Sequence, residues 1–172
     1  MKKTCVIITA SGFQDEEVVY PYYRLLEEGC SVEVATKDGA VVYGKYGVPA
    51  RATMATTELK SSNFDCVILP GGFEAPDRVR LLPEVQGFVR EMNEQKKLVA
   101  AICHGPWIMI SAKVCKGRKM TAFWSIEEDI RNSGADYQHK VPVVIDDNFI
   151  TSPHYNNNGD FMKSVVSYLN NK

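Results

Sequence analysis

The sequence lacks an excess of charge of either sign and any long hydrophobic run, and each absence excludes a class of protein. Its 172 residues carry 20 Lys and Arg against 21 Asp and Glu, so the formal net charge is -1. That balance provides no electrostatic basis for binding nucleic acid or an anionic membrane surface. No stretch reaches the roughly 18–20 apolar residues of a membrane span. We therefore expect neither nucleic acid nor a membrane as a partner.

The N-terminal segment also lacks the length of a secretory signal. Two lysines precede an apolar run, but this run is only about six residues long, short of the apolar region of a signal peptide. Acidic residues follow it from Asp15 onward. We therefore expect residues 4–9 to form a core strand and the protein to be cytoplasmic.

Paired cysteine motifs and glycine-rich phosphate loops are missing as well. The five cysteines are scattered and include no C-x-x-C pair, so neither a disulfide framework nor a metal site is expected. Gly71-Gly72 belongs to no dinucleotide or phosphate-loop motif, and we expect no cofactor. Cys5 and Cys66 lie inside apolar runs and are predicted to be core thiols.

Apolar periodicity predicts an alternation of strands and helices. Short β-branched runs predict buried strands, and apolar residues recurring with a 3.6 period predict helices. The predicted strands are 4–9, 31–36, 64–72 (ending in a Pro-Gly-Gly turn), 98–102, 141–146 and 149–152. The predicted helices are 15–29, 82–95, 105–114, 125–134 and 158–171, with a hairpin in 40–55. This order favours one domain over residues 1–172, an α/β three-layer sandwich with a mostly parallel sheet and helices on both faces.

Cys103 falls directly between the strand 98–102 and the helix 105–114. A tight strand-turn-helix turn projects its central side chain above the sheet, as in a nucleophile elbow. The helix N-terminus favours a thiolate, and the N–H of His104 would face a developing oxyanion. The alternative is that Cys103 only fills a tight turn. Adjacent residues need not face each other, so adjacency alone does not make Cys103 and the His104 side chain a catalytic dyad.

Two further segments lie at predicted strand ends, where α/β folds gather their sites. Gly71 and Gly72 can present N–H groups to the same spot, or they form a simple turn. Glu17 lies early in the first helix. Pro21 has no N–H to donate to the backbone carbonyl of Glu17, four residues earlier, so we expect the helix to be kinked or locally open there. Burial beside a thiolate would raise the pKa of the Glu17 carboxyl. Alternatively, Glu17 only complements the helix dipole.

Four segments taken together resemble the PfpI family, within the superfamily of class I glutamine amidotransferase-like proteins that includes the parkinsonism-associated deglycase. They are "DEEVVYPYYRLLEEG", "FDCVILPGGFEAPDRVR", "LVAAICHGPWIMISA" and "GRKMTAFWSIEEDIRNSGADY". The resemblance covers nearly the whole chain, and the joint order of the segments makes it specific. It implies a flavodoxin-like sandwich that forms homodimers or larger homo-oligomers. Members are described as peptidases, as glyoxalase or deglycase enzymes and as stress proteins.

The resemblance also implies roles for individual residues. Cys103 matches the nucleophile, and Glu17 matches the acid that hydrogen-bonds it. The N–H groups of Gly72 and His104 match the oxyanion pocket. The His104 side chain matches the histidine assigned as catalytic in peptidase-like members, where an acid from a neighbouring subunit orients it. The matching position is Asp77, one methylene shorter than the usual glutamate.

The chain departs from the family pattern beside the expected pocket. Trp107 stands where many relatives carry a smaller or polar residue, and its indole either narrows the pocket or packs against the core. The usual Thr-Ser-Arg at the end of the last strand is Thr-Ser-Pro at 151–153, so the arginine is missing. His154 and Tyr155 border the pocket instead, or they belong to a surface loop.

Two functions from different classes remain open at this point. One is a cofactor-free cysteine enzyme in which Cys103 attacks small carbonyl, aldehyde, amide or peptide-like substrates, with a role in stress protection. The other is a non-catalytic redox sensor that works through reversible oxidation of Cys103. An interaction scaffold with a vestigial pocket is a third. The sequence does not name the substrate.

Overall fold

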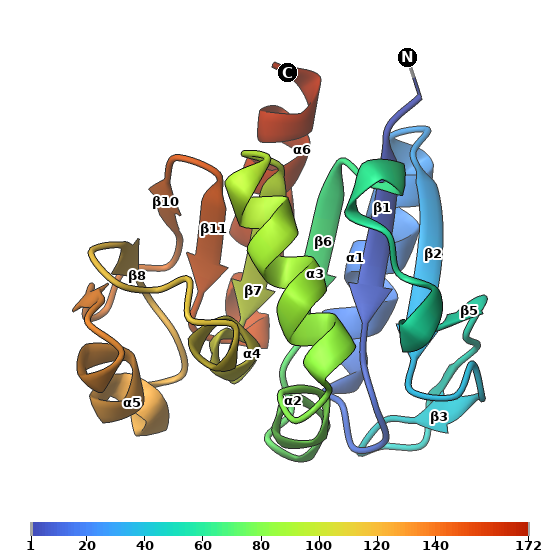
Figure 1. The fold of residues 1–172 in the computed structure, drawn as a ribbon, viewed down its shortest axis with the longest axis horizontal. Helices are drawn as coiled ribbons and strands as arrows, with labels where there is room; N and C mark the ends of the chain where they lie inside the picture. The colour runs from blue at the N-terminus through green and yellow to red at the C-terminus, as the bar shows by residue number, and fades with distance from the viewer. Residues whose placement is uncertain (1, 172) are drawn as a thin grey trace.

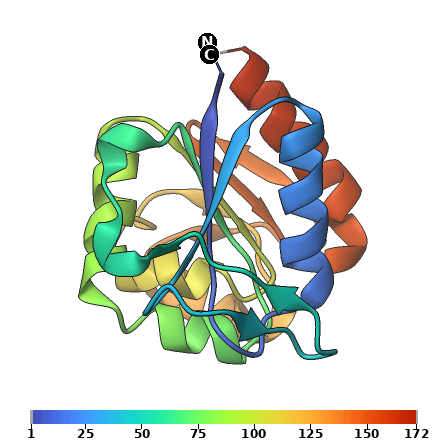
Figure 2. The same ribbon diagram turned by 90° about the vertical axis from the view of Figure 1, so that its right-hand side faces the viewer.

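The computed structural model describes residues 2–171, and its centre is a seven-stranded sheet between two layers of helices (Figure 1 and Figure 2). The strand order is β10-β11-β7-β6-β1-β2-β5, and neighbours are parallel except for the edge pair β10 and β11. The strands are β1 Thr4–Ile8, β2 Ser31–Thr36, β5 Met54–Ala55, β6 Cys66–Leu69, β7 Leu98–Ile102, β10 Val144–Asp146 and β11 Phe149–Ser152. The predicted flavodoxin-like α/β sandwich is confirmed.

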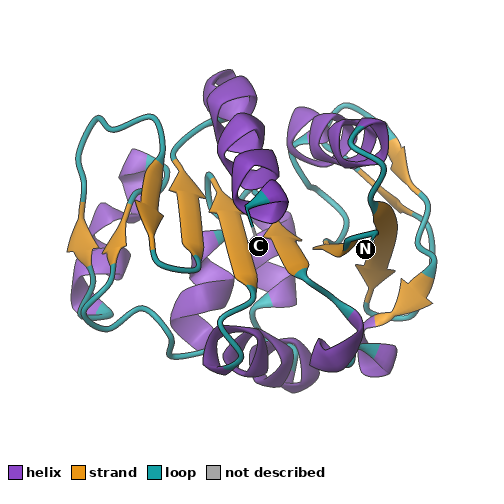
Figure 3. Cartoon of the chain, turned by 90° about the horizontal axis from the view of Figure 1, so that it is seen from above, coloured by secondary structure: helices purple, strands orange, loops and turns teal. Residues whose placement is uncertain are grey.

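Helices cover both faces of this sheet, as the view from above shows (Figure 3). They are α1 Asp15–Glu27, α2 Glu74–Val79, α3 Pro83–Glu94, α4 Pro106–Ser111, α5 Glu127–Asn132 and α6 Asn158–Asn170. In Figure 2, α1 in blue and α6 in red lie on one side, and α3 in green lies on the other.

The two faces follow from the alternation of side chains along a strand. In β1, Val6 and Ile8 belong to the core cluster that includes residues of α3, whereas Cys5 and Ile7 belong to the cluster that includes residues of α1 and α6. Both sets are fully buried. A strand covered on both faces is apolar at every position, which explains the unbroken run in the sequence.

Short elements complete the chain. The predicted hairpin is confirmed, because β3 Val42–Tyr43 pairs antiparallel with β4 Pro49–Ala50. The remaining pieces are β8 Lys119–Met120, β9 Asp136–Tyr137, and the 3-10 helices η1 Thr56–Glu58, η2 Ser61–Asn63, η3 Trp124–Ile126 and η4 Tyr155–Asn157.

Several predicted boundaries are wrong. The helix predicted over 105–114 is the six-residue α4, and α2 was not expected because six residues are too few to show a helical period. The strand predicted over 141–146 begins only at Val144. The expected local opening at Pro21 does not occur, since α1 is helical without interruption. The ring of Pro21 is buried, and its packing offsets the one missing hydrogen bond.

The topology gathers several loops at one edge of the sheet. The carboxyl ends of parallel strands meet at the same edge, and in Figure 1 the short helices α2 and α4 and the hairpin strand β3 lie at that end. The segments that follow β1, β6, β7 and β11 therefore converge there. Within residues 2–171, no helix combines the length and the apolar character needed to cross a bilayer.

Candidate active site

Cys103 occupies a strained turn between β7 and α4. Its φ is 61°, in the left-handed region that a non-glycine residue rarely adopts. The Cys103 N–H donates to the carbonyl of Ser152 at 2.9 Å, and its carbonyl accepts from the N–H of Phe123 at 2.9 Å. These two bonds hold the turn, which has the backbone geometry expected of a nucleophile elbow.

Gly105 makes this turn possible. A side-chain carbon at position 105 would collide with the carbonyl oxygen of Leu69, so only glycine lets the start of α4 approach β6 this closely. Pro106 then occupies the first turn of α4, where a missing N–H removes no helical bond.

Glu17 lies fully buried beneath the thiol. Its Oε2 accepts a hydrogen bond of 2.6 Å from the N–H of Gly71, and Oε1 has no partner of ordinary hydrogen-bond geometry. Burial raises the pKa of the carboxyl to about 8, although the Gly71 bond and the neighbouring Cys103 act in the opposite direction. The carboxyl is therefore mostly protonated at neutral pH. A residue with no exposed surface does more than complement the helix dipole.

The Cys103 thiol is not the preformed thiolate that the sequence predicts. Burial raises its pKa, and the negative charge of ionised Glu17 raises it further. Hydrogen bonds from the N–H groups of Gly72 and His104 lower it. The helix contribution is limited because α4 has only six residues. Protonation of Glu17 removes its negative charge, so the Cys103 thiolate forms most readily when Glu17 carries the proton.

The two glycines after β6 have different tasks. The Gly71 N–H is occupied by Glu17 and its carbonyl accepts from the N–H of Gln14 at 3.2 Å, so the prediction of Gly71 as an oxyanion donor is wrong. A side-chain carbon at Gly71 would overlap both Cys103 and Glu17. Gly71 thus holds the acid against the thiol, and the N–H groups of Gly72 and His104 remain as the pair directed at the sulfur.

The His104 side chain turns toward the thiol, although the two residues are adjacent. Its Nδ1 lies 3.2 Å from Sγ of Cys103, and its Nε2 lies 3.3 Å from Oγ of Ser125. Burial lowers the pKa of His104 to about 4, and the charge of Lys45 lowers it as well. The ring is therefore neutral at pH 7. Asp77 is exposed on α2 and makes no hydrogen bond to His104 within this chain.

A cavity of about 550 Å³ opens above the thiol. Six rings form most of its wall: Phe73, His104, Trp107, Phe123, His154 and Tyr155. The rings of His104 and Phe123 stack at a centroid distance of 4.8 Å. The site is therefore a shallow aromatic pocket with the sulfur at its floor.

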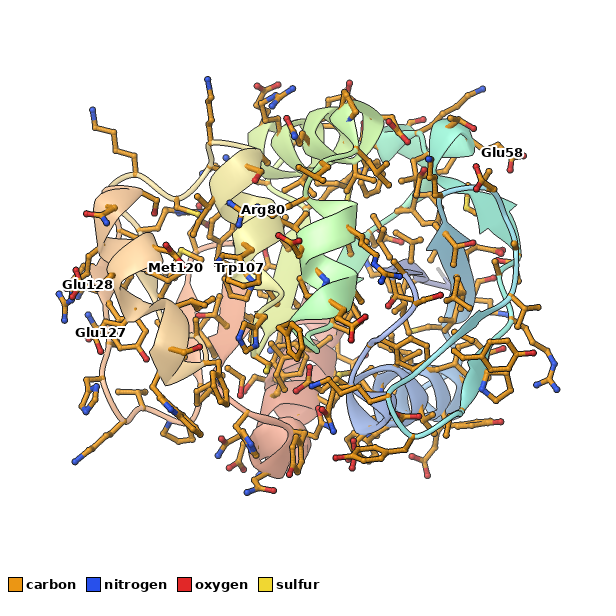
Figure 4. All side chains as sticks on the ribbon, turned by 90° about the horizontal axis from the view of Figure 1, so that it is seen from below. Glu58, Arg80, Trp107, Met120, Glu127 and Glu128 are labelled. Carbon is orange, nitrogen blue, oxygen red and sulfur yellow. The ribbon has the colours of Figure 1, made fainter. Side chains whose placement is uncertain are left out.

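Trp107 both lines the pocket and packs against the core. Its indole N–H donates to Oδ2 of Asp129 at 2.8 Å, and the guanidinium of Arg80 lies 5.4 Å from its ring centre. Figure 4 shows Arg80 and Trp107 side by side. The same indole packs against the core cluster, which confirms one of the two alternatives from the sequence, and it also lines the cavity.

His154, in the loop that follows β11, borders the pocket. Its Nδ1 accepts from the N–H of Asn156 at 3.2 Å, and its ring lies 5.9 Å from that of Trp124. Burial lowers its pKa, so it adds no cation at neutral pH to replace the missing arginine. The pocket is aromatic on this side.

Sequence reasoning missed several lining residues, namely Gln14, Lys45, Phe73, Phe123 and Ser125. None belongs to a motif with a chemical signature. The one available signal for Lys45 was its place in the Gly-Lys-Tyr-Gly turn of the hairpin. Among residues 2–171, no group of three or more His, Cys, Asp or Glu side chains is arranged to hold a metal ion.

Similar proteins share this sequence and fold. The deglycase PfpI of Pyrococcus furiosus is 39% identical over 164 residues, 95% of this chain and 98% of that protein. General stress protein 18 of Bacillus subtilis is 39% identical over 153 residues, 88% of each chain. A crystal structure from Anabaena variabilis, with a DJ-1/ThiJ/PfpI-like and a ferritin-like domain, has a TM-score of 0.95 and 37% identity. The match covers 98% of this chain and 48% of that one.

The family comparison agrees with these relatives. The model of the DJ-1/PfpI family matches residues 2–168, nearly the whole chain. The chain therefore belongs to the DJ-1/PfpI family.

Proposed function

We propose that the protein is a cofactor-independent cysteine enzyme that acts on small reactive carbonyl compounds, 2-oxoaldehydes and their adducts, through Cys103. The observation that carries this proposal is the buried Glu17 carboxyl, held by the Gly71 N–H and facing the thiol at the floor of a cavity. A buried acid of pKa about 8 can both donate and accept a proton near neutral pH. The name deglycase of its relatives supports this substrate class.

The first step uses the donors that point at the sulfur. The Cys103 thiolate adds to the aldehyde carbon, an S–C bond forms, and the carbonyl electron pair moves onto oxygen. The N–H groups of Gly72 and His104 face this oxygen, and Glu17 donates the proton that neutralises it. The product is a hemithioacetal, and Glu17 is left ionised.

Ionised Glu17 then serves as the base. It accepts the proton from the former aldehyde carbon while the neighbouring carbonyl oxygen takes up a proton, which gives an enediol. The neighbouring carbon then gains a proton and the hydroxyl of the former aldehyde loses one, so that the hemithioacetal becomes a thioester without any external oxidant. Water from the cavity hydrolyses the thioester and frees the thiol. One 2-oxoaldehyde and one water thus give one 2-hydroxy acid.

The test is turnover of methylglyoxal by the wild-type protein and by Cys103→Ser, with an amidase assay in parallel. We expect the substitution to lower methylglyoxal turnover by at least about a thousandfold. Cys115→Ser is the matched control, because Cys115 is a buried thiol that does not line the cavity. Unchanged turnover by Cys103→Ser would show that the nucleophile is assigned wrongly.

Peptidase chemistry is disfavoured within one chain, because the ring of His104 contacts Cys103 and Ser125 but, among residues 2–171, no acidic side chain that would orient it, and Asp77 is exposed on α2. The proposal therefore includes a homodimer or larger homo-oligomer in which Asp77 orients His104 of a second copy. A monomer should then lack amidase activity. Gel filtration that finds an active monomer would remove Asp77 from the mechanism.

A redox sensor is the second candidate, and one observation favours it. Glu17 is placed to donate a hydrogen bond to an oxidised sulfur, and Cys103 is the one cysteine among residues 2–171 that lines the cavity. Mild peroxide followed by intact-mass and peptide analysis should then add oxygen at Cys103 first. Equal addition at all five cysteines would remove this candidate. Stress protection and a cytoplasmic location belong to both candidates, and the name of General stress protein 18 supports the former.

A further inference from the structure

Lys45 is a charged residue at the rim of the site that no part of the mechanism uses. It lines the cavity, and its Nζ lies 4.9 Å from the centre of the Phe73 ring. Within residues 2–171 its ammonium group forms no ion pair, whereas Lys3 and Lys96 pair with Asp65 and Asp147. An ammonium group that contacts only an aromatic face is available to an anionic ligand.

The backbone holds Lys45 in this position. Its N–H donates to the carbonyl of Phe13 at 2.9 Å. Just beyond Lys45 in the chain, the N–H groups of Tyr46 and Val48 donate hydrogen bonds of 3.0 Å and 2.9 Å to the buried carboxylate of Asp15. The hairpin turn is thus fastened to the first turn of α1, and Lys45 is carried over the pocket by fixed main chain.

The charge of Lys45 is not balanced inside the cavity. No lining residue is Asp or Glu, and the lining rings of His104 and His154 are neutral at pH 7. Lys45 lowers the pKa of both Glu17 and His104, so its field reaches the reacting centre. The pocket is therefore apolar and aromatic, with one positive charge at its edge.

We propose that Lys45 determines specificity by binding an anionic group of the substrate, so that the site prefers 2-oxoaldehydes that carry a carboxylate at the end remote from the reacting carbonyl. This inference rests on the proposed function. The ammonium lies against the ring of Phe73, whose centroid is 6.5 Å from that of His104, and His104 in turn contacts Sγ of Cys103. A ligand that reaches both the ammonium and the sulfur therefore carries its charged group and its reacting carbonyl at different ends. The carboxylate itself takes no part in bond making or breaking.

The first test compares 4,5-dioxopentanoate with its uncharged methyl ester as substrates. In both, the aldehyde carbon bonds to sulfur, water is consumed and a 2-hydroxy acid forms, so the pair differs only in the remote charge. We expect Lys45→Met to lower the ratio of the two kcat/KM values by about ten- to hundredfold. Lys45→Arg should keep most of the wild-type ratio, and Lys45→Glu should favour the ester.

The ratio separates substrate recognition from general effects on Glu17 and His104, which act on both substrates equally. Lys60→Met is the matched control, because Lys60 is exposed and does not line the cavity. It should leave the ratio as it is in the wild type. A ratio that Lys45→Met does not change, in variants that remain folded by circular dichroism, would overturn the proposal.

A second test does not depend on turnover. N-(2-carboxyethyl)maleimide and its methyl ester both alkylate a thiol: sulfur bonds to one alkene carbon, and solvent protonates the other. We expect Lys45→Met to slow modification of Cys103 by the acid relative to the ester, and 0.5 M salt to reduce the wild-type preference. If neither dioxopentanoate is turned over while this preference is present, the proposed function fails and the anion site stands. If the acid is never preferred, the anion site fails.

Discussion

Two buried cysteines on neighbouring strands show what separates a reactive thiol from a structural one. Cys66 begins β6 and has no exposed surface, and Cys103 follows β7 with 6% exposed. Burial raises the pKa of both thiols. The groups that act on the Cys66 thiol are the thiols of Cys5 and Cys30 and the carboxyl group of Asp65. Those that act on Cys103 are the carboxyl group of Glu17 and two backbone N–H groups, and Cys103 also lines an open cavity. Burial is thus common to both thiols. Only Cys103 combines N–H donors directed at its sulfur with access to an open cavity.

The largest effect is expected where the carboxyl group is replaced by an amide. Glu17→Gln should lower turnover by about 10²- to 10⁴-fold, because the amide cannot transfer a proton. At pH 9 it should also speed alkylation of Cys103, because ionised Glu17 raises the pKa of the wild-type thiol. Steady-state kinetics and alkylation rates measure the two effects separately.

Glu16→Gln is the matched control, since Glu16 is exposed one residue away and its carboxylate accepts a hydrogen bond from the side chain of Gln14. It should alter both rates only slightly. If Glu17→Gln slows turnover and alkylation by the same factor, Glu17 acts on the thiol alone and transfers no proton in the reaction.

The raised pKa of Glu17 should also make the stability of the protein depend on pH below 8. Cys66 should not contribute there, because its thiol is protonated in both the folded and the unfolded chain. The pKa of Glu17 is about 8 in the folded protein and near 4.5 in the unfolded chain, so the folded state holds one more proton between these values. Stability should therefore fall as pH rises from 4.5 to 8. The difference in unfolding free energy, Glu17→Gln minus wild type, should therefore rise by about 1.4 kcal/mol per pH unit in this window.

Urea denaturation at pH 5, 6, 7 and 8 measures this difference. His104 acts in the opposite direction, since its folded pKa of about 4 makes stability rise between pH 4 and 6.5. That contribution is present in both proteins and cancels in their difference. A constant difference across the window would show that Glu17 is ionised in the folded protein at neutral pH.

The two thiols should also differ in access. With limiting iodoacetamide at pH 8, Cys103 should react at least about a hundredfold faster than Cys66, because Cys66 reacts only after local unfolding. Peptide mass spectrometry assigns the modified residue. Equal rates in the native protein would mean that the strand β6 opens as readily as the pocket, and the contrast between the thiols would disappear.

The smallest effect concerns packing. Cys66→Ala should lower the free energy of unfolding by about 1–2 kcal/mol, since removal of the buried sulfur leaves a void in the core beside the sheet. Cys103→Ala should cost less, because its sulfur borders a cavity already open to solvent. A larger loss for Cys103→Ala would identify the elbow as a packing element.

The sequence predicted the sandwich because its strands are covered on both faces, as the unbroken runs around Cys5 and Cys66 indicate. It also placed Cys103 and Glu17 together, because strand-end segments of a parallel sheet converge. It could not assign the Gly71 N–H to Glu17 rather than to an oxyanion, since the direction of one N–H depends on the tertiary turn.

The state of the Cys103 thiol was likewise beyond the sequence. The six-residue length of α4 and the depth of burial decide it, and both are set by packing. The aromatic wall was missed for a different reason. Phe73 precedes α2, whereas Phe123 and Ser125 lie at the 3-10 helix η3, and no local pattern marks the two segments as neighbours.

The first turn of α1 has a consequence for divergence. Asp15 fastens the hairpin loop and Glu17 serves the thiol, so one turn of helix supports two tasks through different side chains. Positions 45 and 46 of the hairpin turn can accept new residues while the nucleophile, its acid and the elbow stay unchanged, whereas Gly47 has a φ of 89° that favours glycine. Libraries confined to those positions therefore offer a route to new substrate ranges on an intact reaction centre, the same route open to natural descendants of this chain.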